Sequence, residues 1–270
     1  MSDDIAPFDR RALRRHRDRA APGLGAHDFL FADVAERLAD RLDDIRRRFP
    51  LALDLGSHDG VLARTLNGRG GIERLVQTDL SPAMALRAAR YGPAIAADEE
   101  RLPFRPVSFD AVLSCLSLHW VNDLPGALIQ ARRALKPDGL FLAAMLGGGT
   151  LRELRAALLE AEVGASGGAS PRISPFAELR DAAALLQRAG FAMPVADSDT
   201  LTVTYETPYA LLQDLRGMGE ANALAARPRR FTRRGVLAGL AERYAPEAGD
   251  GRIAATFQIL FLTAWAPHGA

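Results

Sequence analysis

Apolar runs of strand length alternate with amphipathic segments along the first half of the chain. Over residues 31–49 apolar positions recur at steps of three or four, which predicts an amphipathic helix. Runs with the composition of buried strands follow at 51–55, 75–78, 95–97 and 109–118. Because helical patterns separate these runs, we expect right-handed crossovers that build a parallel α/β sheet with helices on both faces.

Turn and capping residues predict where several helices begin. Ser81 followed by proline is typical of a helix start, and the pattern after it runs to about Tyr91. Thr150 with Glu153 predicts a capping box for a helix over 151–162. The glycines and serines of 164–170 predict a mobile loop after that helix.

The second half of the chain predicts fewer strands and a helical insertion. Residues 178–189 have a helical pattern and 191–205 an extended one, and a last strand is expected over 253–265. We expect four parts along the chain: a basic arm and helix at 1–49, a core at 50–206, a helical insertion or lid at 207–250, and a last core strand with a tail at 251–270.

Glycines and polar side chains stand at the carboxyl ends of the predicted parallel strands, where open α/β sheets bind their ligands. Gly56 lets the backbone lie against a ligand, and Gly60 lets a helix begin close to its strand. A carboxylate such as Asp79 can accept hydrogen bonds from both hydroxyls of a ribose. The spacing therefore predicts a nucleotide-shaped pocket.

Five segments in this region resemble the successive motifs of class I S-adenosylmethionine-dependent methyltransferases. They are LALDLGSHDG, VQTDLSPAM, AADEERLPF, SFDAVLSCLSLHWVNDL and ALKPDGLFLAAM, and they cover about residues 50 to 145 in family order. The resemblance implies a doubly wound, Rossmann-like, mostly parallel seven-stranded sheet whose sixth and seventh strands form an antiparallel edge. His58 departs from the family pattern, which has a glycine there, and we expect it to pack within the loop.

The same resemblance implies S-adenosylmethionine as the cofactor and a set of residues around it. Asp54, Gly56 and Gly60 would face its amino-acid part, Asp79 its ribose and Asp98 its adenine. The complete set expected to bind the cofactor is Asp54, Gly56, Ser57, Gly60, Asp79, Leu80, Asp98 and Glu99.

Two further groups are candidates for contact with the acceptor. His119 and Trp120 follow the fourth strand, where an imidazole could take a proton and an indole could form a wall, although a packed pair that closes the sheet is the alternative. Polar residues in the outer region are candidate substrate-binding residues, with turn and surface roles as the alternative: Arg172, Arg216, Glu220 and Asn222.

The carboxyl-terminal half narrows the resemblance. GASPRISPFAELRDAAALLQRAGF, LLQDLRGMGEANAL and ATFQILFLTAWAP, with FDRRALRRHRDRAA near the start, resemble the complex I assembly factors described as protein arginine hydroxylases. This implies an enzyme that hydroxylates an arginine on an NADH dehydrogenase (complex I) subunit. The alternatives are a malonyl acyl-carrier-protein O-methyltransferase of biotin synthesis and a non-catalytic cofactor-binding assembly chaperone. A nicotinamide-binding dehydrogenase is disfavoured because Gly56 and Gly60 do not form its glycine fingerprint.

Composition and charge limit the partners and the compartment. A net charge of +1 argues against a strongly electrostatic nucleic-acid binder. The single cysteine, Cys115, lies in an apolar run, reads as a small core residue, and fits a reducing compartment. No apolar stretch is long enough to span a bilayer, and the histidines lack the spacing of metal ligands. We therefore expect a cytoplasmic protein without a metal site.

The basic segment over residues 1–24 allows two interpretations. Its arginines favour a solvated basic helix. A lid over the cofactor, or a contact with an acidic partner, is the alternative.

Overall fold

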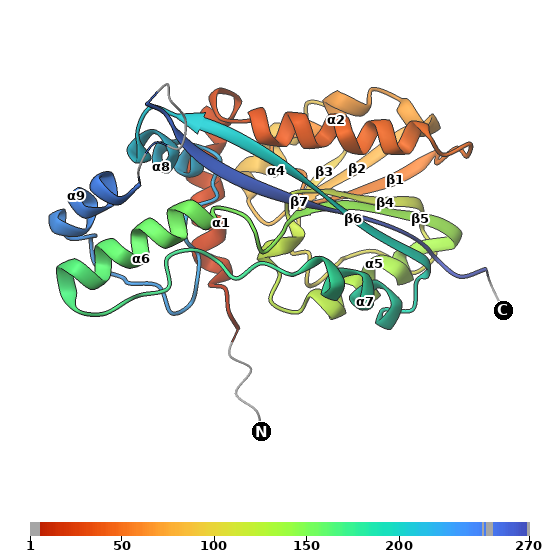
Figure 1. The fold of residues 1–270 in the computed structure, drawn as a ribbon. Coiled ribbons are helices and arrows are strands. Elements are labelled where there is room, and N and C mark those ends of the chain that lie inside the picture. The colour runs from red at the N-terminus through yellow and green to blue at the C-terminus, as the bar shows by residue number, and fades with distance from the viewer. Residues whose placement is uncertain (1–5, 245, 247–250, 269–270) are drawn as a thin grey trace.

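The computed structural model describes residues 6–244, 246 and 251–268. Their strands form one seven-stranded sheet in the order β3-β2-β1-β4-β5-β7-β6. The strands are β1 (Leu51–Leu55), β2 (Arg74–Asp79), β3 (Ala94–Ala96), β4 (Phe109–Cys115), β5 (Leu135–Leu146), β6 (Ala192–Tyr205) and β7 (Ile253–Trp265). Figure 1 shows the sheet crossing the molecule as one twisted layer.

The pairing of the strands confirms the predicted fold class. The first five strands pair in parallel, with Leu53 of β1 opposite Val76 of β2 and Val112 of β4. β7 runs antiparallel between β5 and β6, so the last two strands form the antiparallel edge that the resemblance implied. The predicted last strand at 253–265 has the bounds of β7.

Helices cover both faces of this sheet because both faces are apolar. The helices are α1 (Arg10–Ala20), α2 (Phe29–Asp43), α3 (Val61–Leu66), α4 (Pro82–Ala88), α5 (Leu124–Ala134), α6 (Arg152–Ser166), α7 (Leu179–Arg188), α8 (Pro208–Gly217) and α9 (Arg234–Arg243). Alternate residues of a strand point to opposite faces, so Ala52 packs with the cluster that includes α2 and α3, and Leu53 with that of α5 and α7. Figure 1 shows α2 on one face and α5 and α7 on the other.

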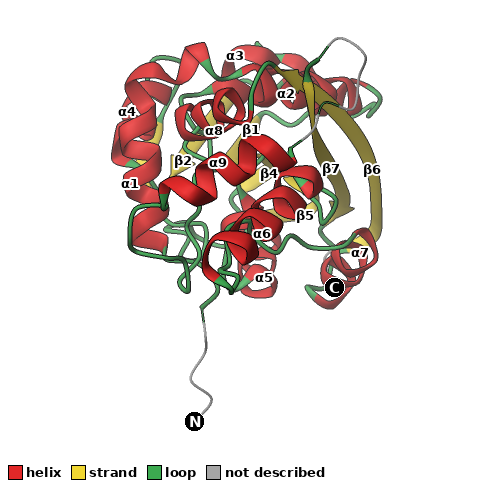
Figure 2. Cartoon of the chain, turned by 60° about the vertical axis from the view of Figure 1, so that its left-hand side comes forward, coloured by secondary structure: helices red, strands yellow, loops and turns green. Residues whose placement is uncertain are grey.

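Three further helices, α6, α8 and α9, lie at one end of the sheet. Figures 1 and 2 both show α6, α8 and α9 close together at one end of the sheet, and α6 packs on α9. The predicted insertion over 207–250 contains α8 and α9, while residues 245 and 247–250 of it lie outside the described part. In the described part of the chain no helix combines the length and hydropathy needed to cross a membrane.

Several predicted element ends were wrong. α2 ends at Asp43 instead of continuing to residue 49. Pro50 explains only why residue 49 itself is not helical, because a proline disfavours helix at the residue before it. Phe49 is nevertheless buried, and its N–H donates to the carbonyl of Gly70 at 3.0 Å. β4 stops at Cys115, after which Leu118–Trp120 form a 3₁₀ turn. α4 stops at Ala88, short of residue 91.

The predicted capping box was also wrong, because the side chains of Thr150 and Glu153 form hydrogen bonds to β7 instead. The N-cap of α6 is Leu151, which has a φ of +54° and no side-chain cap. Thr150 Oγ1 donates to the carbonyl of Gln258 at 3.1 Å, and Glu153 accepts from the Thr256 backbone N–H at 3.2 Å. α6 then continues to Ser166, so the first residues of the predicted loop at 164–170 are helical.

Candidate active site

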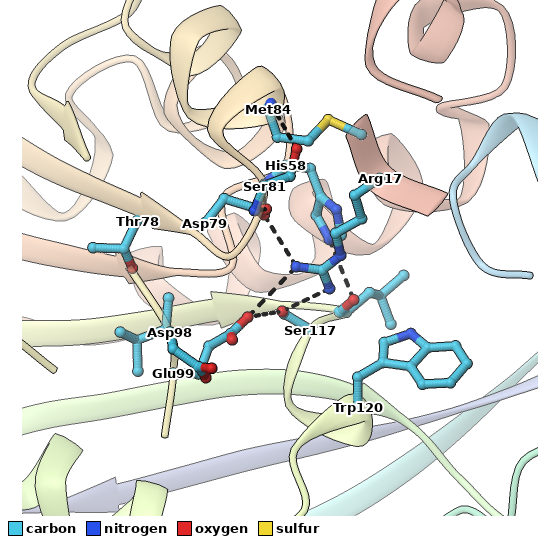
Figure 3. A network of polar contacts seen from close by, with 12 residues as sticks. Arg17, His58, Thr78, Asp79, Ser81, Met84, Asp98, Glu99, Ser117 and Trp120 are labelled. Carbon is cyan, nitrogen blue, oxygen red and sulfur yellow. Dashed lines mark hydrogen bonds and ion pairs between the residues drawn. The ribbon is translucent and has the colours of Figure 1, made fainter. Parts of the chain in front are cut away.

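Polar side chains at the carboxyl ends of β2 and β3 meet around Arg17, as Figure 3 shows. We call this buried, closely packed site, together with Asp54 of β1, the expected cofactor cleft. Asp54, Asp79 and Glu99 are all buried there, with side chains of Asp79 and Glu99 joined through a single arginine, Arg17. Asp98 stands at the rim, with its side chain 31% exposed. The residues predicted to bind the cofactor therefore lie together, as strand ends of one sheet require.

Arg17 of α1 occupies the centre of this cleft. Its side chain is fully buried, and Nη1 lies 3.1 Å from Asp79 Oδ2 and 3.5 Å from Glu99 Oε1. Nη2 donates to Ser117 Oγ at 2.9 Å (Figure 3). Although burial opposes the charged form, the two carboxylates raise the pKa of Arg17 above its ordinary value. The guanidinium is thus held in the space beside the expected ribose carboxylate.

A second arginine of α1 reinforces the same arrangement at the rim. Arg10 pairs with Asp98 at 2.6 Å and with Glu99. It lies two helical turns before Arg17, with the buried Leu13 between them. The interpretation of this segment as a solvated basic helix is therefore wrong for these two residues, and the lid over the cofactor stays a prediction.

Asp54 is a buried carboxyl group whose oxygens have no hydrogen-bond partner among the described residues. Burial, with the charge of nearby Asp79, raises the pKa of Asp54 well above its ordinary value. The neighbouring Ser57 hydroxyl is also buried without a partner in the described part. Unpaired buried groups of this kind are usually satisfied by a ligand or water.

The glycine loop after β1 is closed against Ser117. Gly56 has a φ of +72°, and a Cβ built there would lie 1.9 Å from Ser117 Oγ. Gly60, with a φ of +94°, precedes the first residue of α3. Both positions therefore need glycine, one for close approach and both for the left-handed backbone.

His58 packs inside the loop, which confirms the role predicted for it. Its side chain is fully buried, and Nε2 lies 3.1 Å from the carbonyl oxygen of Cys115. Its ring stacks on Phe31 of α2 with centroids 4.2 Å apart. Burial lowers the pKa of His58, so the neutral form of the ring is favoured in this packed position. Cys115 is itself buried and free, as predicted for a core residue.

The chemistry of the cleft fits S-adenosylmethionine once room is made for it. The carboxylates of Asp79 and Glu99 are acceptors suited to ribose hydroxyls and an adenine amino group. The side chain of Ser117 fills the space beside Gly56, and both carboxyl oxygens of Asp54 lack a hydrogen-bond partner among the described residues. The group in the way is Arg17, whose guanidinium holds Asp79.

His119 and Trp120, the predicted catalytic pair, meet on one carboxylate of the outer region. Glu220 Oε2 accepts a hydrogen bond from Trp120 Nε1 at 2.6 Å and lies 3.1 Å from His119 Nε2. The side chain of Glu220 is only 6% exposed. Leu80 packs with Trp120 and Phe8 in a small apolar cluster beside the cleft. His119 and Trp120, which follow β4, are thus linked through Glu220 to the predicted insertion.

A cavity of about 210 Å³ lies next to this pair, and all four predicted substrate-binding residues line it. Arg172 donates to Glu162 at 2.6 Å and to Thr232 at 3.1 Å. Asn222 donates to the carbonyl of Pro171 at 3.0 Å, and Arg216 is exposed.

Sequence reasoning missed Arg17, Arg10 and Ser117. The helical spacing of Arg10, Leu13 and Arg17 was the available signal for the first two.

The chain is similar to known proteins along nearly its whole length. The family model described as a methyltransferase domain matches residues 53–143. A Danio rerio protein named arginine-hydroxylase NDUFAF5, mitochondrial, is 45% identical over 97% of this chain and 83% of its own length. A malonyl-[acyl-carrier protein] O-methyltransferase of Halorhodospira halophila is 35% identical over 98% of this chain and 91% of its own.

A solved structure shares the fold at low identity. Phosphoethanolamine N-methyltransferase 2 of Haemonchus contortus, in complex with S-adenosyl-L-methionine, has a TM-score of 0.58 and 20% identity. The likeness covers 95% of this chain and 60% of that one. It supports the methyltransferase fold described above.

The relatives contradict the predicted cytoplasmic location. Those from zebrafish, human and mouse are all named as mitochondrial proteins. A single buried cysteine reports a reducing environment but does not distinguish one reducing compartment from another. Given its identity to these relatives across nearly the whole length, the chain belongs to the methyltransferase-fold family that includes the mitochondrial arginine-hydroxylases.

Proposed function

We propose that this protein binds S-adenosylmethionine in the cleft at the ends of β1, β2 and β3. Asp79 would hold the ribose, Asp98 and Glu99 the adenine side, and Asp54 with the Gly56 loop the amino-acid part. The convergence of these residues supports the proposal, as do the methyltransferase-domain match and the likeness to a structure that contains this cofactor. When bound, S-adenosylmethionine supplies a methyl group already activated on a sulfonium.

Binding requires a change at α1. Arg17 must leave Asp79 before ribose hydroxyls can replace it as the partner of this carboxylate. The burial of this site would then exclude water around the cofactor, while Trp120 and Glu220, which are hydrogen-bonded to each other, line the neighbouring cavity. Entry of the cofactor and movement of α1 are therefore coupled in this account.

We further propose that the protein acts on an arginine side chain of a partner protein, and that the reaction is hydroxylation. The observation that carries this proposal is the 45% identity to an arginine-hydroxylase over 97% of the chain. Hydroxylation replaces one hydrogen of the side chain with a hydroxyl group. With dioxygen as the oxidant, the second oxygen atom leaves as water, and an external reductant supplies two electrons and two protons. A subunit of NADH dehydrogenase is the candidate partner, because the sequence resembles complex I assembly factors.

The second candidate function is methylation of a malonyl carrier protein. The Halorhodospira halophila relative favours it, since its similarity also covers 98% of this chain. In that case the acceptor is the free carboxylate of the malonyl group, and the arginines of the outer region would contact an acidic carrier protein.

Mass spectrometry of the products separates these functions. The purified protein is incubated with S-adenosylmethionine, dioxygen, a reductant and either complex I subunits or malonyl carrier protein. A gain of one oxygen atom on an arginine is the expected result. A gain of one methyl group on an arginine would replace hydroxylation with methylation, and methyl transfer to malonyl carrier protein would replace the proposed substrate. Cofactor binding without any product would favour the assembly chaperone.

A further inference from the structure

The cavity beside His119 and Trp120 is small and lined largely by apolar side chains, and Asp54, Asp79 and Glu99 are not among its lining residues. Leu154 and Leu158 of α6 and Leu212 and Leu215 of α8 supply much of its wall. Its volume of about 210 Å³ is below the roughly 300–1,000 Å³ typical of pockets for drug-sized ligands. The cavity therefore suits one long side chain with an apolar stem better than a stretch of peptide.

One carboxylate in the wall of this cavity has an unused acceptor. Glu220 Oε2 is taken by Trp120 and His119, but Oε1 is buried and has no hydrogen-bond partner among the described residues. A buried oxygen left in this state is costly, so the arrangement favours a ligand that donates a hydrogen bond. A carboxylate accepts and never donates, which restricts that ligand to N–H or O–H groups.

The cations nearest Glu220 have carboxylate partners in this structure. Arg17, whose charge also acts on Glu220, is held by Asp79 and Glu99, and Arg172 is held by Glu162. The backbone N–H of Leu146 donates to His119 Nδ1 at 3.5 Å, which leaves the proton on Nε2, where it points to Glu220. Arg216, the other arginine in the wall, is exposed. Glu220 thus keeps one buried acceptor, Oε1, that no described residue uses.

The aromatic side chains in the cavity wall favour a guanidinium group over an ammonium group. Trp120 and Phe176 both line the cavity, and planar guanidinium groups stack on aromatic faces and are more weakly hydrated than ammonium groups. The leucines suit the apolar stem that an arginine buries beneath its charged head.

We propose that Glu220 is a specificity-determining residue that selects a guanidinium-bearing side chain, which enters the leucine-walled cavity and donates to Oε1. This deepens the proposed function and rests on it, because it identifies where the substrate arginine is held. His119 and Trp120 are then positioning residues for Glu220, whose orientation they fix through Oε2.

The test measures binding of Nα-acetyl-L-arginine amide and of its citrulline counterpart, which has the same shape without the charge. The chain has only two tryptophans, so a Trp265→Phe background leaves Trp120, in the cavity wall, as the sole indole reporter of fluorescence. We expect the arginine compound to bind about tenfold to a hundredfold more tightly than the citrulline compound. Glu220→Gln should reduce this preference to less than about twofold, while the exposed Glu242→Gln should retain it.

Three results would overturn the proposal: equal binding of both compounds to the Trp265→Phe protein, a preference that survives Glu220→Gln, or tighter binding of malonyl pantetheine than of the arginine compound. The first and third need no change at Glu220, so they hold even where that variant fails to fold. Titration of the same protein with S-adenosylmethionine keeps the two proposals distinguishable. Arginine binding without cofactor binding would remove the proposed function and leave this site, and the reverse would remove the site alone.

Discussion

Arg17 Nη1 lies 3.1 Å from Asp79 Oδ2, and both side chains are fully inaccessible to solvent. This pair joins the amino-terminal helix to the carboxylate at the end of β2, where the cofactor's ribose is expected. The N-terminal arm is therefore part of the cleft. Under the proposed function, a cofactor whose ribose binds Asp79 would compete with Arg17 for this carboxylate, so movement of α1 and cofactor binding would be linked.

Replacing Arg17 should destabilise the protein strongly. Arg17→Met leaves Asp79 and Glu99 buried without their shared cation, and breaking a buried pair in this way costs about 3–5 kcal/mol. Urea denaturation would measure the loss in free energy of unfolding. Arg15→Met, at an exposed position of the same helix, serves as the control and should stay within about 0.5 kcal/mol. A similar small change for both variants would show that the buried pair contributes nothing.

The contribution of Glu99 to stability should depend on pH. Burial opposes its charge, but Arg10, Arg17 and the hydroxyl of Ser117 outweigh this and lower the pKa of Glu99 to about 2. Because the folded pKa lies below the unfolded value of about 4.3, this stabilisation is complete above that value and is lost as pH falls towards 2.

Comparison of Glu99→Gln with the wild-type protein isolates this effect. The difference in their free energies of unfolding should be largest near pH 7 and shrink below about pH 4.5. Chemical denaturation at a series of pH values measures it. A difference that is constant across this range would mean that Glu99 is not held in its charged form by the arginines.

Gly56→Ala should damage the loop between β1 and α3. The new Cβ would lie 1.9 Å from Ser117 Oγ at a residue whose φ is +72°, so both the contact and the backbone are unfavourable. We expect a loss of about 1–3 kcal/mol in thermal or urea unfolding, accompanied by weaker cofactor binding. Gly25→Ala, where nothing lies within 4 Å of the added carbon, is the matched control. Equal stability of the two variants would contradict the close packing against Ser117.

Most of the sheet and the glycine loop after β1 were predictable because their signals are local. Each apolar run carries its own strand pattern, and the polar residue that ends it, such as Asp54 or Asp79, follows directly in the sequence. Parallel strands bring these ends together without further information. The bounds of β7 were predicted for the same reason, since its run is long and ends sharply.

The contacts that were missed depend on residues distant in sequence. Arg17 and Asp79 are 62 residues apart in the sequence. Thr150 and Glu153 form hydrogen bonds to β7, which lies near the carboxyl terminus. A capping box is a local pattern, but the competing partners of its side chains are not local. Likewise, a run of arginines favours a solvated helix, and only the folded structure shows that two of them pair with carboxylates from distant parts of the chain.

Calorimetric titration with S-adenosylmethionine tests the central claim, that the carboxylates and glycines at the ends of β1, β2 and β3 form its binding site. The wild-type protein should bind it, and Asp79→Asn should weaken binding by roughly 1–3 kcal/mol, through loss of charged hydrogen bonds. The exposed Asp181→Asn should bind as the wild type does. Absence of binding to the wild type, or unchanged affinity in a folded Asp79→Asn variant, would contradict the claim.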